Sequence, residues 1–253
     1  MSVLIKTAGK TIDLFSQMLP GRILDVPAGG GEECAQAHQR GWQPVAADIC
    51  ANGRYHSMFP WVVADANEGF PFKQDCFDYV LCREGIEHFE TQAGFLRECA
   101  RVLKPGGKLV VTTPNIMHLS ARLSSFLTCQ RSLRRGLANE VQTFRGMYGR
   151  RVYHGHIFLI DYFRLRYLLR IVGFDRIHVY TDCYSATSLA LGWITPLLFL
   201  ASRLSVSMSK RLGRRKAIKL ASGPLLEEIF SHVFSPALLF GKRMIVVAEK
   251  IDS

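Results

Sequence analysis

A short apolar run that ends in an acid and opens into a glycine-rich turn restricts the possible folds of this chain more than any other feature. Residues 22–26, "RILDV", read as a strand, residues 27–31, "PAGGG", as a turn, and residues 32–41 as a helix that stops at Gly41. Such a unit exposes backbone N–H groups at the helix N-terminus and lets a ligand approach the main chain closely. One glycine turn is a weak signal, so the remaining strands decide its meaning.

Six further apolar runs read as strands, at residues 43–49, 61–66, 77–82, 108–115, 175–182 and 243–250. Helices are predicted at residues 11–18, 92–107 and 161–174, the last from the helical spacing of Phe163, Tyr167, Leu168 and Ile171. Strands that alternate with helices indicate a parallel sheet covered by helices, and continuous apolar runs are typical of strands buried on both faces. The predicted fold is α/β, with a doubly wound, mostly parallel seven-stranded sheet.

The segment before the last strand has a different character. Residues 186–202 hold no charge, seven Lys and Arg residues follow within 203–219 with no acid among them, and a second apolar piece covers residues 229–241. We therefore assign residues 1–183 and 242–253 to the core and residues 184–241 to a hydrophobic and basic helical insertion. An apolar segment beside lysines and arginines suits an anionic membrane surface, here through residues 186–219. A cap over the site, a dimer face and a true membrane span are the alternatives.

The charge of the chain is concentrated in its second half. Residues 1–120 hold 11 Lys and Arg against 13 Asp and Glu, a net charge of −2, whereas residues 121–253 hold 21 against 8, a net charge of +13. The second half is therefore expected to face an anion: a lipid surface, a phosphorylated substrate or nucleic acid. A basic surface kept for solubility is the alternative.

The cysteines indicate a reducing compartment. All seven are scattered, without a C-x-x-C pair, which argues against a disulfide framework or a zinc site. The apolar start of the chain is interrupted by Lys6 and Lys10, so it does not resemble a signal peptide. A cytoplasmic location is expected, with peripheral contact at the inner face of the plasma membrane.

Three acids stand at the ends of successive predicted strands: Asp25, Asp48 and Asp65. The carboxyl ends of parallel strands form the ligand-binding edge of such sheets. Asp48 follows Gly29 by 19 residues, where a carboxylate can accept hydrogen bonds from ribose hydroxyls. Asp65 can take an adenine amino group, and Asp25 lies at the base of the turn. The alternative for each is an acid that only caps a loop.

The turn argues against a pyrophosphate ligand. Glu32 and Glu33 follow the glycines directly, no lysine stands in the turn, and no G-x-x-x-x-G-K-[ST] sequence is present. A cofactor with ribose and adenine but no phosphate fits better. S-adenosylmethionine is such a molecule, and its sulfonium is a cation that two glutamates suit.

In this combination the sequence resembles the class I S-adenosylmethionine-dependent methyltransferases, in the group that includes ubiquinone-biosynthesis and glycan-modifying enzymes. "LDVPAGGG" is similar to the cofactor loop, "AADI" to the ribose acid, "VVADANEGFPFKQDCFDYVLCREGIEHF" to the run from the adenine-side acid to a Glu-His pair, "RVLKPGGKLVVTTPN" to the next helix and strand, and "HGHIFLIDYFRLRYLLRIVGF" to a His-containing loop and helix. The resemblance covers about residues 22–174 and resumes at 244–250. It implies a Rossmann-like fold and S-adenosyl-L-methionine as cofactor.

The resemblance also implies a set of cofactor contacts. These are Asp25, Ala28, Gly29, Gly31, Asp48, Ile49, Asp65, Ala66 and Arg83. The chain departs from the family at one point, because Pro27 stands where the family has its first glycine. Proline fixes φ near −65°, so this position cannot adopt a positive φ. We interpret the turn as a modified but working loop.

Two segments offer groups for the chemistry. Glu87 and His88 follow the fourth strand; His88 is the candidate base for a hydroxyl acceptor, with Glu87 beside it, and a helix-capping or packing role is the alternative. His156 is a substrate-side candidate or a structural loop histidine. No metal is expected, because no cysteine or acid cluster stands near His154 and His156.

The positions after two strands are weaker candidates. Glu84 is expected to touch the cofactor or close the pocket. Asn115 follows the fifth strand and reads as a substrate contact or as a turn former after Pro114.

The predicted function is S-adenosylmethionine-dependent methyl transfer, on oxygen, to a lipid-linked, phosphorylated or glycan acceptor at a membrane surface. A methyltransferase for a soluble or quinone-like small molecule is one alternative, and a non-catalytic scaffold that keeps the fold is another. Nucleic acid is disfavoured as a partner, because the Asn-Pro-Pro-aromatic motif of amine-methylating enzymes is absent: "TTPN" and "REGIEHF" do not match it. The sequence leaves the oligomeric state open.

Overall fold

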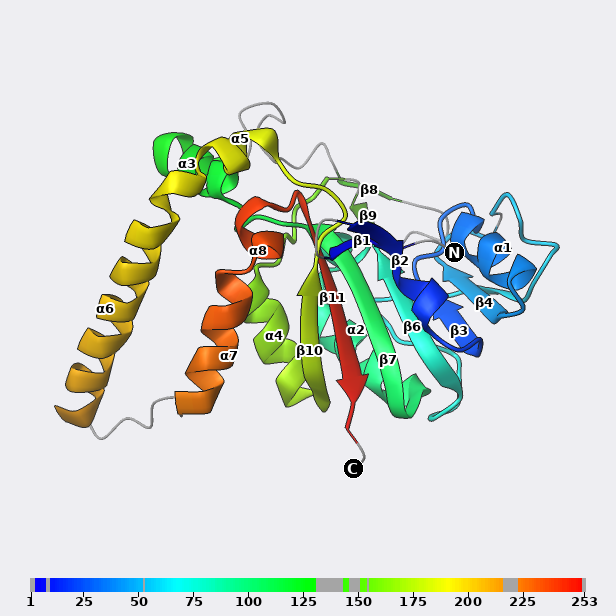
Figure 1. The fold of residues 1–253 in the computed structure, drawn as a ribbon. Coiled ribbons are helices and arrows are strands. Elements are labelled where there is room, and N and C mark those ends of the chain that lie inside the picture. The colour runs from blue at the N-terminus through cyan, green and yellow to red at the C-terminus, as the bar shows by residue number, and fades with distance from the viewer. Residues whose placement is uncertain are drawn as a thin grey trace.

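A seven-stranded sheet forms the centre of the molecule (Figure 1). The structure is a computed structural model that describes residues 3–7, 10–51, 53–130, 143–145, 151–153, 155–215 and 223–251. The sheet order is β10-β11-β7-β6-β3-β4-β5, and β11 alone runs antiparallel to its neighbours within it. The strands are β3 (Arg22–Asp25), β4 (Gln43–Asp48), β5 (Trp61–Val63), β6 (Phe77–Arg83), β7 (Leu103–Pro114), β10 (Phe174–Tyr180) and β11 (Arg243–Lys250). All seven predicted strands are present, which confirms the predicted fold class.

The central strands are buried on both faces, as their continuous apolar runs predict. Along β6, Val80 and Cys82 belong to one buried cluster, whereas Leu81 belongs to the cluster on the opposite face. The first cluster includes side chains of α2 (Gln92–Val102) and α4 (Tyr162–Ile171). The second includes the N-terminal segment and Ala37 of α1 (Glu32–Gln39). The sheet is therefore covered on both sides.

The helix predicted at residues 11–18 is wrong in its first half. A hairpin of β1 (Leu4–Thr7) and β2 (Lys10–Asp13) precedes a 3₁₀ turn, η1 (Leu14–Gln17). Val3 and Ile5 are buried while Leu4 is exposed, which is the two-residue period of a strand. The Lys6 backbone N–H donates to the Thr181 carbonyl at 2.7 Å, so the hairpin is attached beyond the end of β10.

Helix α4 is present as predicted, but the residues whose spacing predicted it are not the ones that it buries. Tyr162, Leu165 and Leu169 are buried, whereas Phe163 and Tyr167 are 51% and 63% exposed. Both sets have helical spacing, so periodicity alone could not choose between them. The neighbouring helix α2 also differs from its prediction: it ends at Val102, and β7 begins at once at residue 103 rather than at 108.

The insertion between β10 and β11 is helical, and only part of it packs on the core. Its elements are α5 (Ala186–Ala190), η5 (Gly192–Ile194), α6 (Thr195–Arg215), α7 (Gly223–Val233) and α8 (Pro236–Phe240). Val233 and Leu238 belong to the main core cluster, so the apolar piece at residues 229–241 packs inward. Helix α6 lies outside α7, with Phe199 against Phe230 at a ring distance of 5.9 Å (Figure 1).

Helix α6 turns an apolar face outward. Leu197, Leu200, Leu204 and Met208 follow helical spacing and are each more than half exposed, and Trp193 of η5 is 78% exposed. No described helix is long and apolar enough to cross a membrane. The basic residues of this segment are only partly described, since Lys216 and Lys219 lie outside the described residues.

One member of the basic group has an acidic partner that the local sequence did not reveal. Arg203 binds both carboxylate oxygens of Glu227 on α7, at 2.6 and 2.9 Å, and lies over the Phe199 and Phe230 rings. Arg203 therefore docks α6 onto α7. Helix α3 (Leu119–Thr128) packs beside α5, and its Phe126 is 84% exposed (Figure 1). The short strands β8 (Thr143–Arg145) and β9 (Arg151–Tyr153) pair separately.

Candidate functional site

The glycine-rich turn between β3 and α1 lies at the carboxyl edge of the sheet. Val26 N–H donates to the Leu81 carbonyl and Ala28 N–H to the Ala47 carbonyl, both at 2.9 Å, so the turn is fixed to the two neighbouring strands. Gly29 has φ +55° and Gly31 has φ +87°, conformations that favour glycine. These are the two predicted glycines, and the loop adopts the shape that they permit.

Pro27 has a definite packing role in this loop. Its ring lies against Gly85, where an added Cβ atom would collide with Pro27 Cδ. Gly85 immediately precedes η2 (Ile86–His88), the short 3₁₀ turn after β6. The proline therefore joins the glycine-rich loop to the segment that carries Glu87 and His88.

Asp48 holds the loop from the next strand. Its Oδ2 accepts from the Gly29 N–H at 2.8 Å and its Oδ1 from the Cys50 N–H at 2.9 Å. Asp48 is 7% exposed and the following Ile49 is half-buried. These two contacts are those of an acid that caps a loop, which was the alternative reading of Asp48. Its role as a ribose ligand stays a prediction.

Asp65 caps its own turn in a similar way. Its Oδ1 accepts from the Asn67 backbone N–H at 2.9 Å, and Asn67 Oδ1 accepts from the Thr91 N–H at 3.0 Å. Ala66 is buried. An open surface depression of about 420 Å³ lies beside this turn, lined by Val63, Ala64, Asp65, Glu68, Gly69, Phe70, Pro71 and Glu98. The adenine-side role of Asp65 stays a prediction.

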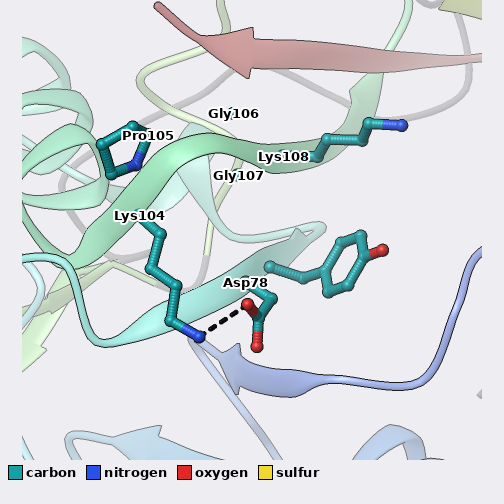
Figure 2. Close-up of a pocket in the computed structure, with 7 residues that line it drawn as sticks. Asp78, Lys104, Pro105, Gly106, Gly107 and Lys108 are labelled. Carbon is teal, nitrogen blue, oxygen red and sulfur yellow. Dashed lines mark hydrogen bonds and ion pairs between the residues drawn. The ribbon is translucent and has the colours of Figure 1, made fainter. Parts of the chain in front are cut away.

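A second depression lies at the opposite edge of the sheet. Figure 2 shows its lining of Asp78, Tyr79 and residues 104–108, around a volume of about 180 Å³. Lys104 Nζ binds Asp78 there at 2.7 Å. These residues belong to the amino ends of β6 and β7, whereas ligands of parallel sheets bind at the carboxyl ends. We therefore do not assign the site to this depression.

Asp25 is buried beneath the loop and Arg83 covers the start of α1. Burial raises the pKa of Asp25 to about 7, although a hydrogen bond from the Cys34 thiol opposes this shift. Arg83 forms an ion pair with Glu33. Glu33 thus has a cationic partner within the protein, and the expectation that both glutamates offer negative charge to the cofactor stays a prediction. The Glu32 carboxylate lies over Gly30, where an added Cβ would meet it.

The three predicted catalytic residues meet in space. Glu87 is completely buried, and His88 and His156 are half-buried. One nitrogen or oxygen atom from each of the three lies within 4.8 Å of the others. The two imidazole rings are 5.2 Å apart and nearly perpendicular, at 87°. Residues 69 positions apart in the chain thus form one cluster, while His154 lies outside the described residues.

Two buried polar residues that the sequence analysis missed support this cluster. Thr113 Oγ1 donates to Glu87 Oε2 at 2.9 Å, and Gln92 Nε2 donates to the carbonyls of Ile86 and Phe158. Gln92 therefore connects η2 with the loop that follows His156. Thr113 could have been found from the sequence, because it is a polar residue at the end of an otherwise apolar strand.

Two weaker candidates, Asn115 and Glu84, make defined hydrogen bonds within the fold. The Asn115 amide donates to the carbonyls of Ala237, Leu238 and Gly241, at 3.3, 3.0 and 2.8 Å, so it clamps α8 to the end of β7. Its Oδ1 accepts from the Met117 N–H at 2.9 Å, which confirms the turn-forming alternative. Glu84 has φ +48° and is hydrogen-bonded to Thr112, and burial raises its pKa. A non-glycine residue in this conformation is often found at functional sites.

These features define an α/β protein of the Rossmann-like type, with a glycine-rich loop at the carboxyl edge of its sheet. The family model described as "Methyltransferase domain" matches residues 4–179, more than half of the chain. The chain belongs to this methyltransferase family. The match confirms the predicted assignment to S-adenosylmethionine-dependent methyltransferases and the predicted cofactor, S-adenosylmethionine.

Curated relatives match a shorter part of the chain. The ubiquinone biosynthesis O-methyltransferase of Xanthomonas oryzae pv. oryzae is 36% identical over 103 residues, which cover 37% of this chain and 43% of the relative. The mitochondrial ubiquinone biosynthesis O-methyltransferase of Mus musculus is 35% identical over 114 residues, 40% of this chain and 31% of the relative. The matched segment thus spans less than half the length of these relatives.

Solved structures share the fold over nearly the whole chain. An S-adenosylmethionine-dependent methyltransferase from Archaeoglobus fulgidus has a TM-score of 0.52 at 16% identity, covering 91% of this chain and 86% of its own. Phosphoethanolamine N-methyltransferase 2 of Haemonchus contortus, in complex with S-adenosyl-L-methionine, has a TM-score of 0.51 at 21% identity, covering 94% and 50%. At these identities the likeness is one of fold.

Proposed function

We propose that the chain transfers the methyl group of S-adenosylmethionine to an oxygen of a lipid-linked, phosphorylated or glycan acceptor at the cytoplasmic surface of a membrane. The supporting observation is that Glu87, His88 and His156 converge beside the glycine-rich loop, which Pro27 joins to Gly85. A group that can accept a proton therefore borders the loop that family resemblance assigns to the methyl donor.

The proposed reaction is an in-line displacement at carbon. The hydroxyl oxygen of the acceptor attacks the methyl carbon, the C–S bond breaks, and its electron pair stays on sulfur. His88 takes the hydroxyl proton, because imidazole is basic near neutral pH. Buried Glu87 beside it stabilises the imidazolium, and His156 contacts the acceptor.

The membrane surface is proposed from the outward face of α6. Leu197, Leu200, Leu204 and Met208 form an exposed apolar stripe, which soluble surfaces usually avoid, and Trp193 stands at its beginning. A stripe of this kind next to lysines and arginines is typical of helices that lie in the interface of an anionic bilayer. The net charge of +13 in residues 121–253 supports the same partner.

The test measures both methyl transfer and its location. The chain is incubated with radiolabelled S-adenosylmethionine and a bacterial membrane lipid extract, with and without anionic liposomes. Label is expected in the lipid phase, more with liposomes, and not with His88→Ala; His38→Ala, which changes an exposed histidine of α1, is the matched control. Label confined to water-soluble products contradicts the lipid-linked acceptor. Absence of cofactor binding at millimolar concentration favours the non-catalytic scaffold.

A soluble or quinone-like small molecule is the second candidate acceptor. It is favoured by the identity of 36% with a ubiquinone biosynthesis O-methyltransferase over 103 residues. Hydroxylated aromatic compounds tested with the same radiolabelled cofactor distinguish the two candidates. Turnover of such a compound in the absence of liposomes supports the second one.

A further inference from the structure

The cluster of Glu87, His88 and His156 has the composition of a metal site. No acid stands near His156 in the sequence, which is why no metal was expected. The fold places an acid beside His156: Glu87, which lies 69 residues earlier in the chain. One possible ligand atom from each of Glu87, His88 and His156 lies within 4.8 Å of the other two. We propose that these three residues bind one divalent zinc-like ion.

The donor set selects the class of ion. Two imidazole nitrogens and one carboxylate oxygen are a ligand set of catalytic zinc sites, which keep a further position open. Calcium and magnesium prefer oxygen donors alone. The site is therefore expected to favour Zn²⁺ or Co²⁺ over Mg²⁺ or Ca²⁺.

The distances need only a small adjustment. Ligand atoms about 2.0–2.2 Å from a zinc ion lie roughly 3.4 Å from one another at the tetrahedral angle. The present limit of 4.8 Å exceeds this by about 1.4 Å. His88 and His156 are half-buried, so rotation of their side chains can close the gap and an ion can reach them from solvent.

The surrounding hydrogen bonds hold the ligands in place. Thr113 donates to Glu87 Oε2, and the Phe158 N–H donates to the Glu87 carbonyl at 3.1 Å. Gln92 adds its two contacts to the same segments. Partners of this kind orient metal ligands, and their loss typically lowers metal affinity about 10–100-fold.

The consequence for catalysis rests on the proposed function, whereas metal binding does not. An ion held here would bind the acceptor hydroxyl at its open position and lower the pKa of that hydroxyl, so that the proton could pass to solvent. In the metal-bound form His88 would be a ligand, and the role of proton acceptor given to His88 in the proposed function would apply to the metal-free form alone. The acceptor class narrows to molecules whose reacting hydroxyl can enter a metal coordination sphere.

Calorimetric titration of the metal-free chain with ZnCl₂ tests the site directly. One saturable site is expected in the parent chain and in His38→Ala. His156→Ala and Glu87→Gln are expected to weaken binding at least about tenfold, and Thr113→Val by about tenfold. Equal affinity in the parent chain and His156→Ala, or no saturable binding by the parent chain, overturns the proposal.

A second measurement separates ligand loss from misfolding. Co²⁺ added to the parent chain is expected to give visible absorption bands of a low-coordinate nitrogen and oxygen site, absent in His156→Ala protein whose circular dichroism is unchanged. Bands that persist in this variant contradict the assignment. Cofactor binding without metal binding removes this inference and leaves the proposed function standing. Metal binding without methyl transfer supports the metal site and contradicts the proposed function.

Discussion

Thr113 and Glu87 form a hydrogen-bonded pair in which both side chains are completely buried, with Oγ1 of the threonine 2.9 Å from Oε2 of the glutamate. The pair connects the end of β7 to η2. A buried carboxylate that loses a donor costs about 1–3 kcal/mol. Thr113→Val should therefore lower the free energy of unfolding by this amount in urea titrations, and Thr113→Ser, which keeps the hydroxyl, should lower it less. Equal losses would show that packing of the methyl group matters more than the hydrogen bond.

Asp48 is expected to support cofactor binding through the loop that it holds. Asp48→Ala removes the acceptor for the Gly29 and Cys50 N–H groups, and with it the proposed ribose contact. Calorimetry with S-adenosylmethionine should show affinity reduced several-fold or more. The affinity of Asp48→Asn, which keeps one acceptor oxygen, should lie between that of the parent chain and that of Asp48→Ala. Unchanged affinity in Asp48→Ala removes the ribose assignment.

Asp25 gives the chain a pH-dependent instability. Burial raises its pKa from 3.8 to about 7, so between these values the folded state binds more protons than the unfolded state. The contribution of Asp25 to stability therefore falls as pH rises through this window, by an amount on the order of 4 kcal/mol at most. Asp25→Asn should gain stability relative to the parent between pH 4 and 7 in thermal melts. A difference that does not vary with pH contradicts this.

Adjacent glutamates on α7 allow a matched test of how the insertion is docked. Glu228 binds Arg166, whose side chain is 8% exposed, and Arg170, both at 3.0 Å. Glu227 is 62% exposed and binds Arg203. Glu228→Gln should cost about 1–2 kcal/mol of unfolding free energy, since it leaves a buried guanidinium poorly paired. Glu227→Gln should cost about 0–1 kcal/mol. The reverse order in urea titrations would mean that Arg203 is the main anchor.

The exposed stripe of α6 should carry the membrane contact. Leu200→Glu with Leu204→Glu places charges on the outward face and is expected to abolish co-sedimentation with anionic liposomes without changing the melting temperature. Deletion of residues 186–219 would be a less specific test, because it would also remove Ser188 of α5, which is completely buried and hydrogen-bonded to His118. The matched control is Ser205→Glu, an exposed polar position on the same helix. A parent chain that never sediments contradicts the membrane proposal.

The sheet could be predicted because its signals are local. Each strand is a short apolar run bounded by glycine, proline or an acid, and Gly29 and Gly31 mark a turn that needs positive φ. The N-terminal hairpin was missed because its alternation covers only a few residues, Val3 to Ile5, and its attachment to Thr181 depends on the far end of the chain.

The candidate site was predictable in its members but not in its arrangement. Family resemblance indicated Glu87, His88 and His156, yet only the fold brings them within reach of one another. The partners Arg83–Glu33 and Arg203–Glu227 join separate elements, so charge counts along the sequence could not reveal them. The turn-forming alternative for Asn115 rests on a local contact with Met117 and was predictable, whereas its clamp on α8 was not, because the three acceptors lie more than 120 residues away.

The order of the sheet also determines when the fold can be completed during synthesis. β10 is the edge strand beyond β11, and residues 181–242 separate the two in the chain. On a ribosome, β10 therefore emerges long before the strand that joins it to the sheet. Until residues 243–250 follow, the far side of β7 is an open edge, which is prone to mispairing with other chains. A nascent chain paused within the insertion should accordingly depend on chaperones to protect that edge.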